Sequence, residues 1–252
     1  MDNIFEQVSK GNKYKITVNQ HIIPVESIKR FTNTNNKVNI KNLISKNKKV
    51  VQVNPKDSIF TVKRFWSEID EAGYMKIIED NFQKLIDKII NKDLLEFSFT
   101  ENQIIWKMYL LWMYRVEFFG KYQQINSFNI KTDSVYTQLE KEKIESIGMS
   151  YHDNGYIPSR FIIGGQIQLA IMGDISLYKN IKWKIIFSKN INFIMPSNPY
   201  MNSKDTDNLI LYFPISSNIC LLPYNEFKVS TDFVNDLNTL MKQNSKWFYF
   251  WE

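Results

Sequence analysis

The spacing of hydrophobic residues changes twice along the chain. Up to about residue 66, short apolar runs alternate with polar residues, a period-two pattern that is typical of strands. Residues 13–18 alternate in this way and predict a first strand. Residues 38–44 and 48–53 lie on either side of a polar S-K-N-K stretch and predict a β-hairpin. Pro24 stands where a helix begins most readily and predicts a short helix after it.

Between about residues 67 and 180 the hydrophobic period becomes helical. Residues 74–90 place their apolar side chains on one face, which predicts a strongly amphipathic helix. The members of this face are Ile77, Ile78, Phe82, Leu85, Ile86, Ile89 and Ile90. Residues 101–119 are apolar on nearly all sides, so we expect them to form the central helix of a bundle. Thr100 is the expected N-cap of that helix, with Gln103 at the capping-box position.

Two further helices and a second region of strands follow. A charged helix is expected from residue 132 or 134 to 147, where Gly148 ends it. The next helix, at 158–178, contains the pair Gly164–Gly165, which indicates either close packing or a kink.

Residues 185–223 return to short apolar runs that are separated by proline turns, and they predict three or four strands. A last helix is expected over residues 230–246. The fold class is therefore α+β, with a mixed or antiparallel sheet built from the N-terminal and C-terminal thirds. The helical bundle, at about 67–180, is inserted between these thirds within a single domain, 1–252.

Composition and charge narrow the classes of partner. The chain has 252 residues, a formal charge of +6 and an aromatic content of 15%. A basic excess is compatible with nucleic acid as partner. A codon usage that favours Lys, Asn and Ile also explains it, and the scattered lysines favour that second explanation.

The sequence favours a cytoplasmic protein that does not enter a membrane. Its one cysteine, Cys220, lies in an apolar run and is expected to be a small buried side chain. The longest apolar run, 104–114, contains Lys107 and is too short to span a bilayer. The N-terminus has neither the basic nor the apolar segment of a signal peptide.

The common catalytic motifs are missing from the sequence. It has no metal-ligand spacing of histidines or cysteines, no phosphate-binding glycine loop and no G-x-S-x-G motif. A divalent metal would suit a nuclease, but no ligand spacing supports one, and the cofactor stays unassigned.

Three titratable residues are candidates for a site. His21 lies between a strand and a helix start, where an imidazole acts as acid or base near neutral pH or serves a structural hydrogen bond. Arg115 is the one arginine in a nearly all-apolar helix, so its guanidinium needs a carboxylate such as Glu79 or Glu117. A structural ion pair and a phosphate-binding site are both consistent with this arrangement.

These residues occur in an order that resembles a bacterial family of unknown function. H-I-I-P at 21–24 and Arg30-Phe31 resemble the His-x-x-Pro…Leu-Arg-x-Phe opening of that family. The resemblance extends over about residues 20–245 and implies further site residues by their positions. They are Glu79, Arg115, Trp183, Phe193, Ile194, Ser197, Asn198, Pro199, Phe213, Pro214, Ile215, Ser216 and Asn238.

One position departs from the family's pattern. The Ser-Asp-x-Pro turn of the family is Pro196-Ser197-Asn198-Pro199 here, so Ser197 stands where an acidic residue is expected. If that acid does chemistry or binds a metal in relatives, this chain lacks it.

Two hypotheses of function follow. In the first, the protein is a nuclease-like effector in phage defence or a toxin setting. His21 would be its acid or base, Arg115 would hold phosphate, Glu79 would orient one of them and Ser197 would complete the catalytic set. In this hypothesis Arg30, Asn198 and Asn238 are binding residues.

In the second hypothesis, the protein is a non-catalytic binding or assembly subunit of a defence complex, with a degenerate site. The aromatic C-terminus, W-F-Y-F-W-E, must either fold back onto the body or meet a protein partner.

Overall fold

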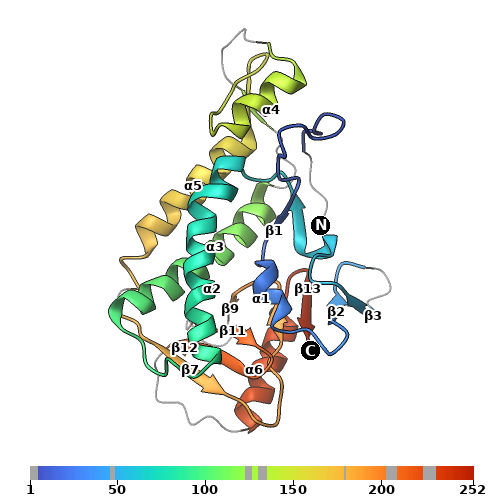
Figure 1. Ribbon diagram of the computed structural model, residues 1–252. Helices are drawn as coiled ribbons and strands as arrows, with labels where there is room; N and C mark the ends of the chain where they lie inside the picture. Colours follow the sequence, from blue (N-terminus) through green and yellow to red (C-terminus); the bar gives the residue numbers. More distant parts are fainter. Residues whose placement is uncertain are drawn as a thin grey trace.

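The described strands of the computed structural model form a three-stranded sheet, a four-stranded sheet and three two-stranded ladders, which pack with the helices (Figure 1). The structure describes residues 5–45, 49–122, 127–129, 135–178, 180–202, 209–223 and 231–252. Helices and antiparallel strands are both well represented, so the predicted α+β class is confirmed.

The N-terminal third forms short strands and one short helix. β1 (Asn19–His21) pairs antiparallel with β4 (Thr61–Lys63). Between them lie α1 (Val25–Lys29), which begins after Pro24, and the predicted hairpin of β2 (Val38–Asn42) and β3 (Val50–Val53).

The middle of the chain is helical, as predicted. A turn of π-helix at Asp70–Met75 leads into α2 (Lys76–Ile90), which is followed by α3 (Phe99–Tyr122) and α4 (Gln138–Ser146). β5 (Ser127–Asn129) pairs with β6 (Tyr156–Pro158), and α5 (Ser159–Asp174) begins directly after β6.

The C-terminal third supplies most of the sheet residues. β7 (Trp183–Phe187), β11 (Phe213–Ser216) and β12 (Ile219–Pro223) form one sheet in the order β11-β12-β7. A second sheet has the order β3-β2-β13-β8 and includes β8 (Met195–Pro196) and β13 (Phe248–Trp251). β9 (Tyr200–Asn202) and β10 (Leu209–Leu211) pair with each other, and α6 (Thr231–Asn244) is the last helix.

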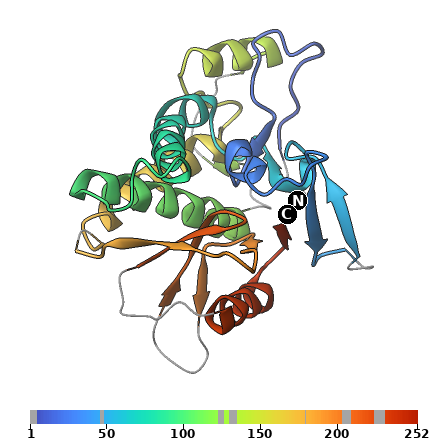
Figure 2. The ribbon, with the colours of Figure 1, turned by 60° about the horizontal axis from the view of Figure 1, so that its bottom comes forward.

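Both sheets separate two apolar clusters. Trp183, Leu221 and Phe250 belong to the larger cluster, which includes residues of α2, α3 and α5. Ile186 and Cys220, which alternate with such residues, belong to a smaller cluster with α6. Figure 2 shows the orange strands between the green helix α3 and the red helix α6. β11, β12 and β13 are therefore buried on both faces over most of their length, which explains their nearly continuous apolar runs, whereas most of β3 and part of β7 are exposed.

The aromatic C-terminus folds back into the protein. β13 lies between β2 and β8 in the second sheet, and Phe248 and Phe250 pack edge-on against Phe60. Tyr249 turns to the opposite cluster. Phe248, Tyr249 and Phe250 are buried, whereas Trp247 and Trp251 are partly exposed.

The pair Gly164–Gly165 in α5 marks a close approach. A Cβ atom added to Gly164 would overlap the carboxyl group of Asp70, whereas one added to Gly165 would meet nothing within 4 Å. Of the two alternatives, close packing therefore applies at Gly164.

Five local predictions were wrong. The described residues between 183 and 223 form six strands, β7 to β12, instead of the three or four expected, because the apolar runs are broken into shorter strands. Residues 13–18 form no strand, because the Asn12 side chain bonds both main-chain groups of Ile16 and thereby closes a turn. α3 begins earlier than expected, and Ser98 and Glu101 cap it instead of Thr100 and Gln103.

The other two concern helix faces and helix starts. Ile77 and Ile90 are exposed and do not belong to the buried face of α2. α4 begins at Gln138, with Thr137 as N-cap and Glu140 completing a capping box. The earlier part of that predicted helix, 130–134, falls outside the described residues. Within the described part of the chain, no helix has both the length and the apolar character needed to cross a membrane.

Candidate functional site

The position of His21 is fixed by the short β1–β4 ladder. His21 pairs with Thr61, and its neighbour Gln20 is buried. The Gln20 amide accepts hydrogen bonds from the main-chain N–H groups of Phe65 and Trp66 and donates one to the Trp66 carbonyl at 2.9 Å. The strand end that carries His21 is thereby tied to the segment that precedes α2.

Arg115 crosses from α3 to α2 in the interior. Its side chain is 1% exposed, and its Nη1 lies 2.5 Å from Oε1 of Glu79. The Nη2 atom lies 3.8 Å from Oε2 of Glu71, and the guanidinium stacks 4.8 Å above the ring of Trp66. The expected pairing with a carboxylate is confirmed for Glu79, whereas Glu117 is exposed.

His21 lies close enough to Arg115 for the positive charge of the guanidinium to lower the pKa of the imidazole. Burial lowers the pKa of His21 to about 4, and the charges of Arg115 and, more weakly, Lys56 act in the same direction. A hydrogen bond to the Pro55 carbonyl opposes them. His21 is therefore a neutral imidazole at pH 7.

The two ring nitrogens of His21 have different surroundings. Nε2 is buried and has no hydrogen-bond partner among the described residues. The hydrogen bond to Pro55 is therefore assigned to Nδ1, which leaves a lone pair on Nε2. This nitrogen can accept a proton from a reacting group, but a pKa of about 4 makes His21 a weaker base than an ordinary histidine.

Glu71 completes this group of side chains. Burial raises the pKa of Glu71, while the nearby Arg115 and the indole N–H that Trp66 donates to its carboxylate oppose the rise. We call His21, Glu71, Glu79 and Arg115 the polar centre. Glu71 and Glu79, with side chains 23% and 24% exposed, connect it to the surface.

Arg30 follows the last residue of α1 and contacts α2 at positions beyond the polar centre. It donates to Gln83 and pairs with Asp87 at 2.9 Å, one and two turns beyond Glu79. The Asp87 side chain is mostly exposed, so this ion pair lies at the surface and fixes α1 to α2.

Ser197 and Asn198 bind a different part of the chain. The Ser197 hydroxyl accepts from the N–H of Trp247 at 3.1 Å, and the Asn198 amide accepts from the N–H of Lys246 at 2.9 Å. Asn198 also donates to the carbonyl of Asn244. Both side chains are buried, and these contacts hold the turn between α6 and β13.

Asn238 is also part of this C-terminal framework. Its amide accepts from the N–H of Ile194 and donates to the carbonyl of Asn192, which joins α6 to the segment before β8. The structure thus brings together His21, Glu79 and Arg115, and places Ser197, Asn198 and Asn238 in contacts around the α6–β13 turn and β8.

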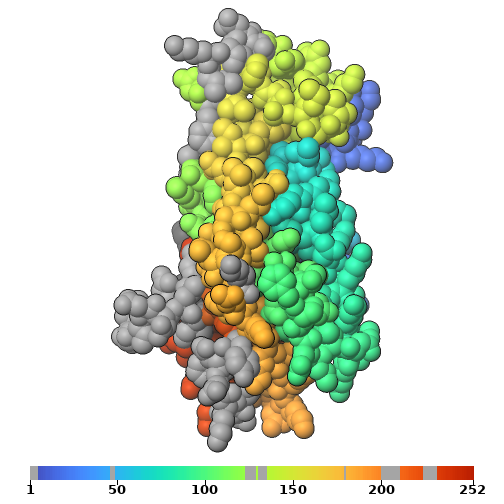
Figure 3. Space-filling view, turned by 90° about the vertical axis from the view of Figure 1, so that its left-hand side faces the viewer, coloured from blue at the N-terminus to red at the C-terminus, as the bar shows by residue number. Residues whose placement is uncertain are grey.

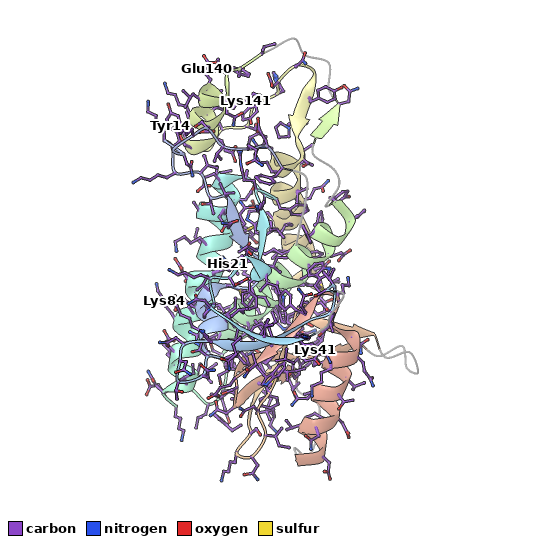
Figure 4. All side chains as sticks on the ribbon, turned by 90° about the vertical axis from the view of Figure 1, so that its right-hand side faces the viewer. Tyr14, His21, Lys41, Lys84, Glu140 and Lys141 are labelled. Atoms are coloured by element: carbon purple, nitrogen blue, oxygen red, sulfur yellow. The ribbon has the colours of Figure 1, made fainter. Side chains whose placement is uncertain are left out.

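A second ionic cluster was missed by the sequence reasoning. Arg160 on α5 bonds to Glu145 on α4 and to Glu6 in the N-terminal segment, and Arg64 bonds to the same Glu145 at 2.6 Å. Beside them a pocket of about 250 Å³ is lined by Lys141 and Asp153, among others. The charges are mutually paired, and Figure 4 shows Lys141 well away from His21. The cluster joins three segments that are distant in sequence.

Two further kinds of site, a metal-ligand cluster and a reactive cysteine, are absent from the described residues. None of them form a group of three or more His, Cys, Asp or Glu side chains placed to hold a metal ion. Cys220 is buried, and burial raises the pKa of its thiol well above the ordinary range, so it is a packing residue as expected.

The comparisons with known proteins identify a family. A family model described as a protein of unknown function, DUF4238, matches residues 19–248. No curated protein and no solved structure matches the chain. The matched range begins with the first residue of β1 and ends with the first residue of β13, so it includes the whole polar centre. The chain belongs to the DUF4238 family of proteins of unknown function.

Proposed function

We propose that this protein is a nuclease-like effector that acts on nucleic acid, with the polar centre as its reaction site. The observation that carries the proposal is the neutral His21, whose Nε2 has no partner among the described residues and lies near a guanidinium. A titratable group with a strongly shifted pKa and a charged neighbour is a recognised sign of a catalytic site.

The chemistry assigned to each residue follows from its state. Nε2 of His21 takes the proton of the attacking hydroxyl or water, because it is unprotonated at neutral pH. Arg115 supplies positive charge for the phosphate, and Glu79 holds the guanidinium in its orientation. Nε2 and Arg115 are both buried. In this proposal the side chains of Glu71 and Glu79 therefore move aside at the surface before the substrate reaches Nε2 and Arg115.

The composition agrees with this class of substrate. The chain carries six more cationic than anionic residues, and such an excess favours association with phosphate backbones. The proposal includes a cytoplasmic role in phage defence or as a toxin. That role depends entirely on the proposed nuclease activity.

The test is incubation of the purified protein with tRNA, total RNA and duplex DNA, with and without Mg²⁺. We expect cleavage of at least one substrate and its loss in His21→Ala. The matched control is His152→Ala, which changes the other histidine of the chain at an exposed position. Intact substrates that also fail to bind at low salt contradict the proposal.

A second function is favoured by the enclosure of the polar centre. Arg115 is already bonded to Glu79 and Ser197 to Trp247, so a non-catalytic binding or assembly subunit of a defence complex needs no exposed reaction site. A complex of fixed stoichiometry that forms equally well with His21→Ala, from a chain that cleaves nothing, supports this function. Because β13 is a central strand with Phe248 to Phe250 buried, a partner of such a subunit meets only the partly exposed Trp247 and Trp251 of the C-terminal rings.

A further inference from the structure

The edge of the β11-β12-β7 sheet has backbone groups that point away from the sheet. Ser188 donates its N–H to Asn218, which leads into β12, whereas Trp183 donates its N–H to the side chain of Asn102 on α3. Alternate residues of an antiparallel strand direct their N–H and C=O groups to opposite sides. Ile185 and Phe187 therefore turn their N–H and C=O groups away from β12, as Trp183 does.

The outward side of β7 borders a groove. The groove has a volume of about 540 Å³ and runs between β7 and the link that joins α2 to α3. Ile185, Trp183 and the cations Lys182 and Lys184 form one wall, and Leu95 and Phe97 contribute to the other. Figure 3 shows the face on which the green link and the orange segment of β7 adjoin.

A buried donor lies in the same wall. Trp183 is 4% exposed, and its Nε1 has no hydrogen-bond partner among the described residues. A buried N–H group without an acceptor is unfavourable in a folded protein. The indole of Trp106, which packs against Trp183, has by contrast an acceptor in the Ile181 carbonyl.

We propose that this groove binds an extended peptide segment of a partner, which adds to β7 as a further strand. The outward N–H and C=O groups of Ile185 and Phe187, which pair with no other strand among the described residues, match the alternating groups of an extended peptide backbone. The apolar side chains of the groove accept an apolar side chain of the peptide, and Lys182 and Lys184 favour acidic residues beside it. Glu96, on the other wall, repels acidic side chains, so the acidic residues of the peptide are expected to face Lys182 and Lys184.

The groove favours a peptide over a nucleic-acid strand. Two lysines opposed by one glutamate give a weak field for a phosphate backbone, which binds through several cations at once. The open backbone groups of β7 have, in addition, no matching pattern in a sugar-phosphate chain. The proposal is independent of the reaction assigned to the polar centre.

An array of synthetic peptides of about seven residues, with Val, Ile, Glu and Lys in alternating positions, tests the proposal on the full chain. We expect peptides that alternate apolar and acidic residues to bind and their lysine counterparts to bind at least about tenfold more weakly. Hydrogen exchange at the amides of Ile185 and Phe187 should slow when an acidic peptide is present. A labelled single-stranded RNA serves as the competing probe.

Two sets of variants locate the binding. Ile185→Pro removes an N–H that faces away from β12 and leaves the β7–β12 ladder intact, so it should weaken the peptide at least about tenfold. Its control, Ile185→Ala, keeps the N–H. Lys184→Glu should weaken acidic peptides, and the exposed Lys189, which is outside the groove, provides the control Lys189→Glu.

Three results overturn the proposal. They are an array without a binding peptide, peptide binding that Lys184→Glu leaves unchanged, and RNA binding that Lys184→Glu abolishes while no peptide binds. If Ile185→Pro fails to fold, the exchange rates of the Ile185 and Phe187 amides in the unaltered chain decide alone. Unchanged rates at a saturating concentration of peptide then contradict strand addition.

Discussion

The guanidinium of Arg115 on α3 is bonded to the carboxylate of Glu79 on α2, with Nη1 and Oε1 2.5 Å apart. This contact joins the nearly all-apolar helix α3 to its amphipathic neighbour α2. The guanidinium is almost fully enclosed, so its charge depends on Glu79 and on the more distant Glu71 for compensation.

Glu79→Gln should therefore destabilise the protein. The variant leaves the buried charge of Arg115 with Glu71 alone, at 3.8 Å, and we expect a loss of about 2 kcal/mol, less than for a fully enclosed pair. Urea unfolding at pH 7 measures the change. In an Arg115→Met background the same substitution should cost close to nothing, because the charge is gone.

The matched control is Glu117→Gln, an exposed position on the same helix as Arg115. We expect a change within about 0.5 kcal/mol there. Equal effects of Glu79→Gln and Glu117→Gln would show that the Arg115–Glu79 contact contributes no more than a surface ion pair.

The lowered pKa of His21 predicts how stability depends on pH. The unfolded chain binds a proton at this residue near pH 6.5, whereas the folded chain does so only near pH 4. As the pH falls from about 6.5 towards 4, the unfolded state is favoured, and the loss reaches up to about 3 kcal/mol. Above pH 7 the contribution of His21 is constant.

This dependence is measured by chemical denaturation at several pH values. The protein should lose more stability between pH 7 and pH 4.5 than His21→Gln does, because the glutamine does not titrate. His152→Gln, at an exposed position, is the matched control. A slope that His21→Gln leaves unchanged would mean that His21 takes up its proton equally in the folded and unfolded states.

Part of the polar centre could be predicted from the sequence. Arg115 follows from the pattern alone, since a guanidinium in an almost wholly apolar helix needs a carboxylate partner. Glu71 could not be found in this way. Gly73 has φ −103° and ψ −105° and interrupts the helix between Glu71 and Glu79, so spacing along the sequence does not report their common position.

The C-terminal residues were candidates for a site or a partner surface, but the structure gives them a role in the framework. Ser197 lies in a polar turn at a strand end, which is where sites are often found, yet its hydroxyl serves the main chain of Trp247. The run from Phe248 to Trp251 is aromatic throughout because both of its faces are buried in the sheet, a fact that depends on tertiary pairing with β2 and β8.

Ser197→Ala should destabilise the turn that joins α6 to β13. The substitution removes the acceptor of the partly buried Trp247 N–H, and we expect a loss of about 1 kcal/mol in thermal or urea unfolding. Ser146→Ala, at the exposed end of α4, is the control and should change little. A Ser197→Ala protein of unaltered stability would mean that another group replaces the lost acceptor.

The contact between α5 and the turn before α2 gives the last prediction. Gly164→Ala places a methyl group into the carboxyl of Asp70, and Asp70 Cβ lies only 2.9 Å from the added atom, so the side chain cannot simply rotate away. We expect a loss of about 2 kcal/mol. Gly165→Ala has open space and should be neutral or stabilising by about 0.5 to 1 kcal/mol, as alanine favours helices. In an Asp70→Gly background, Gly164→Ala should cost much less, and an undiminished cost there would place its effect outside this contact.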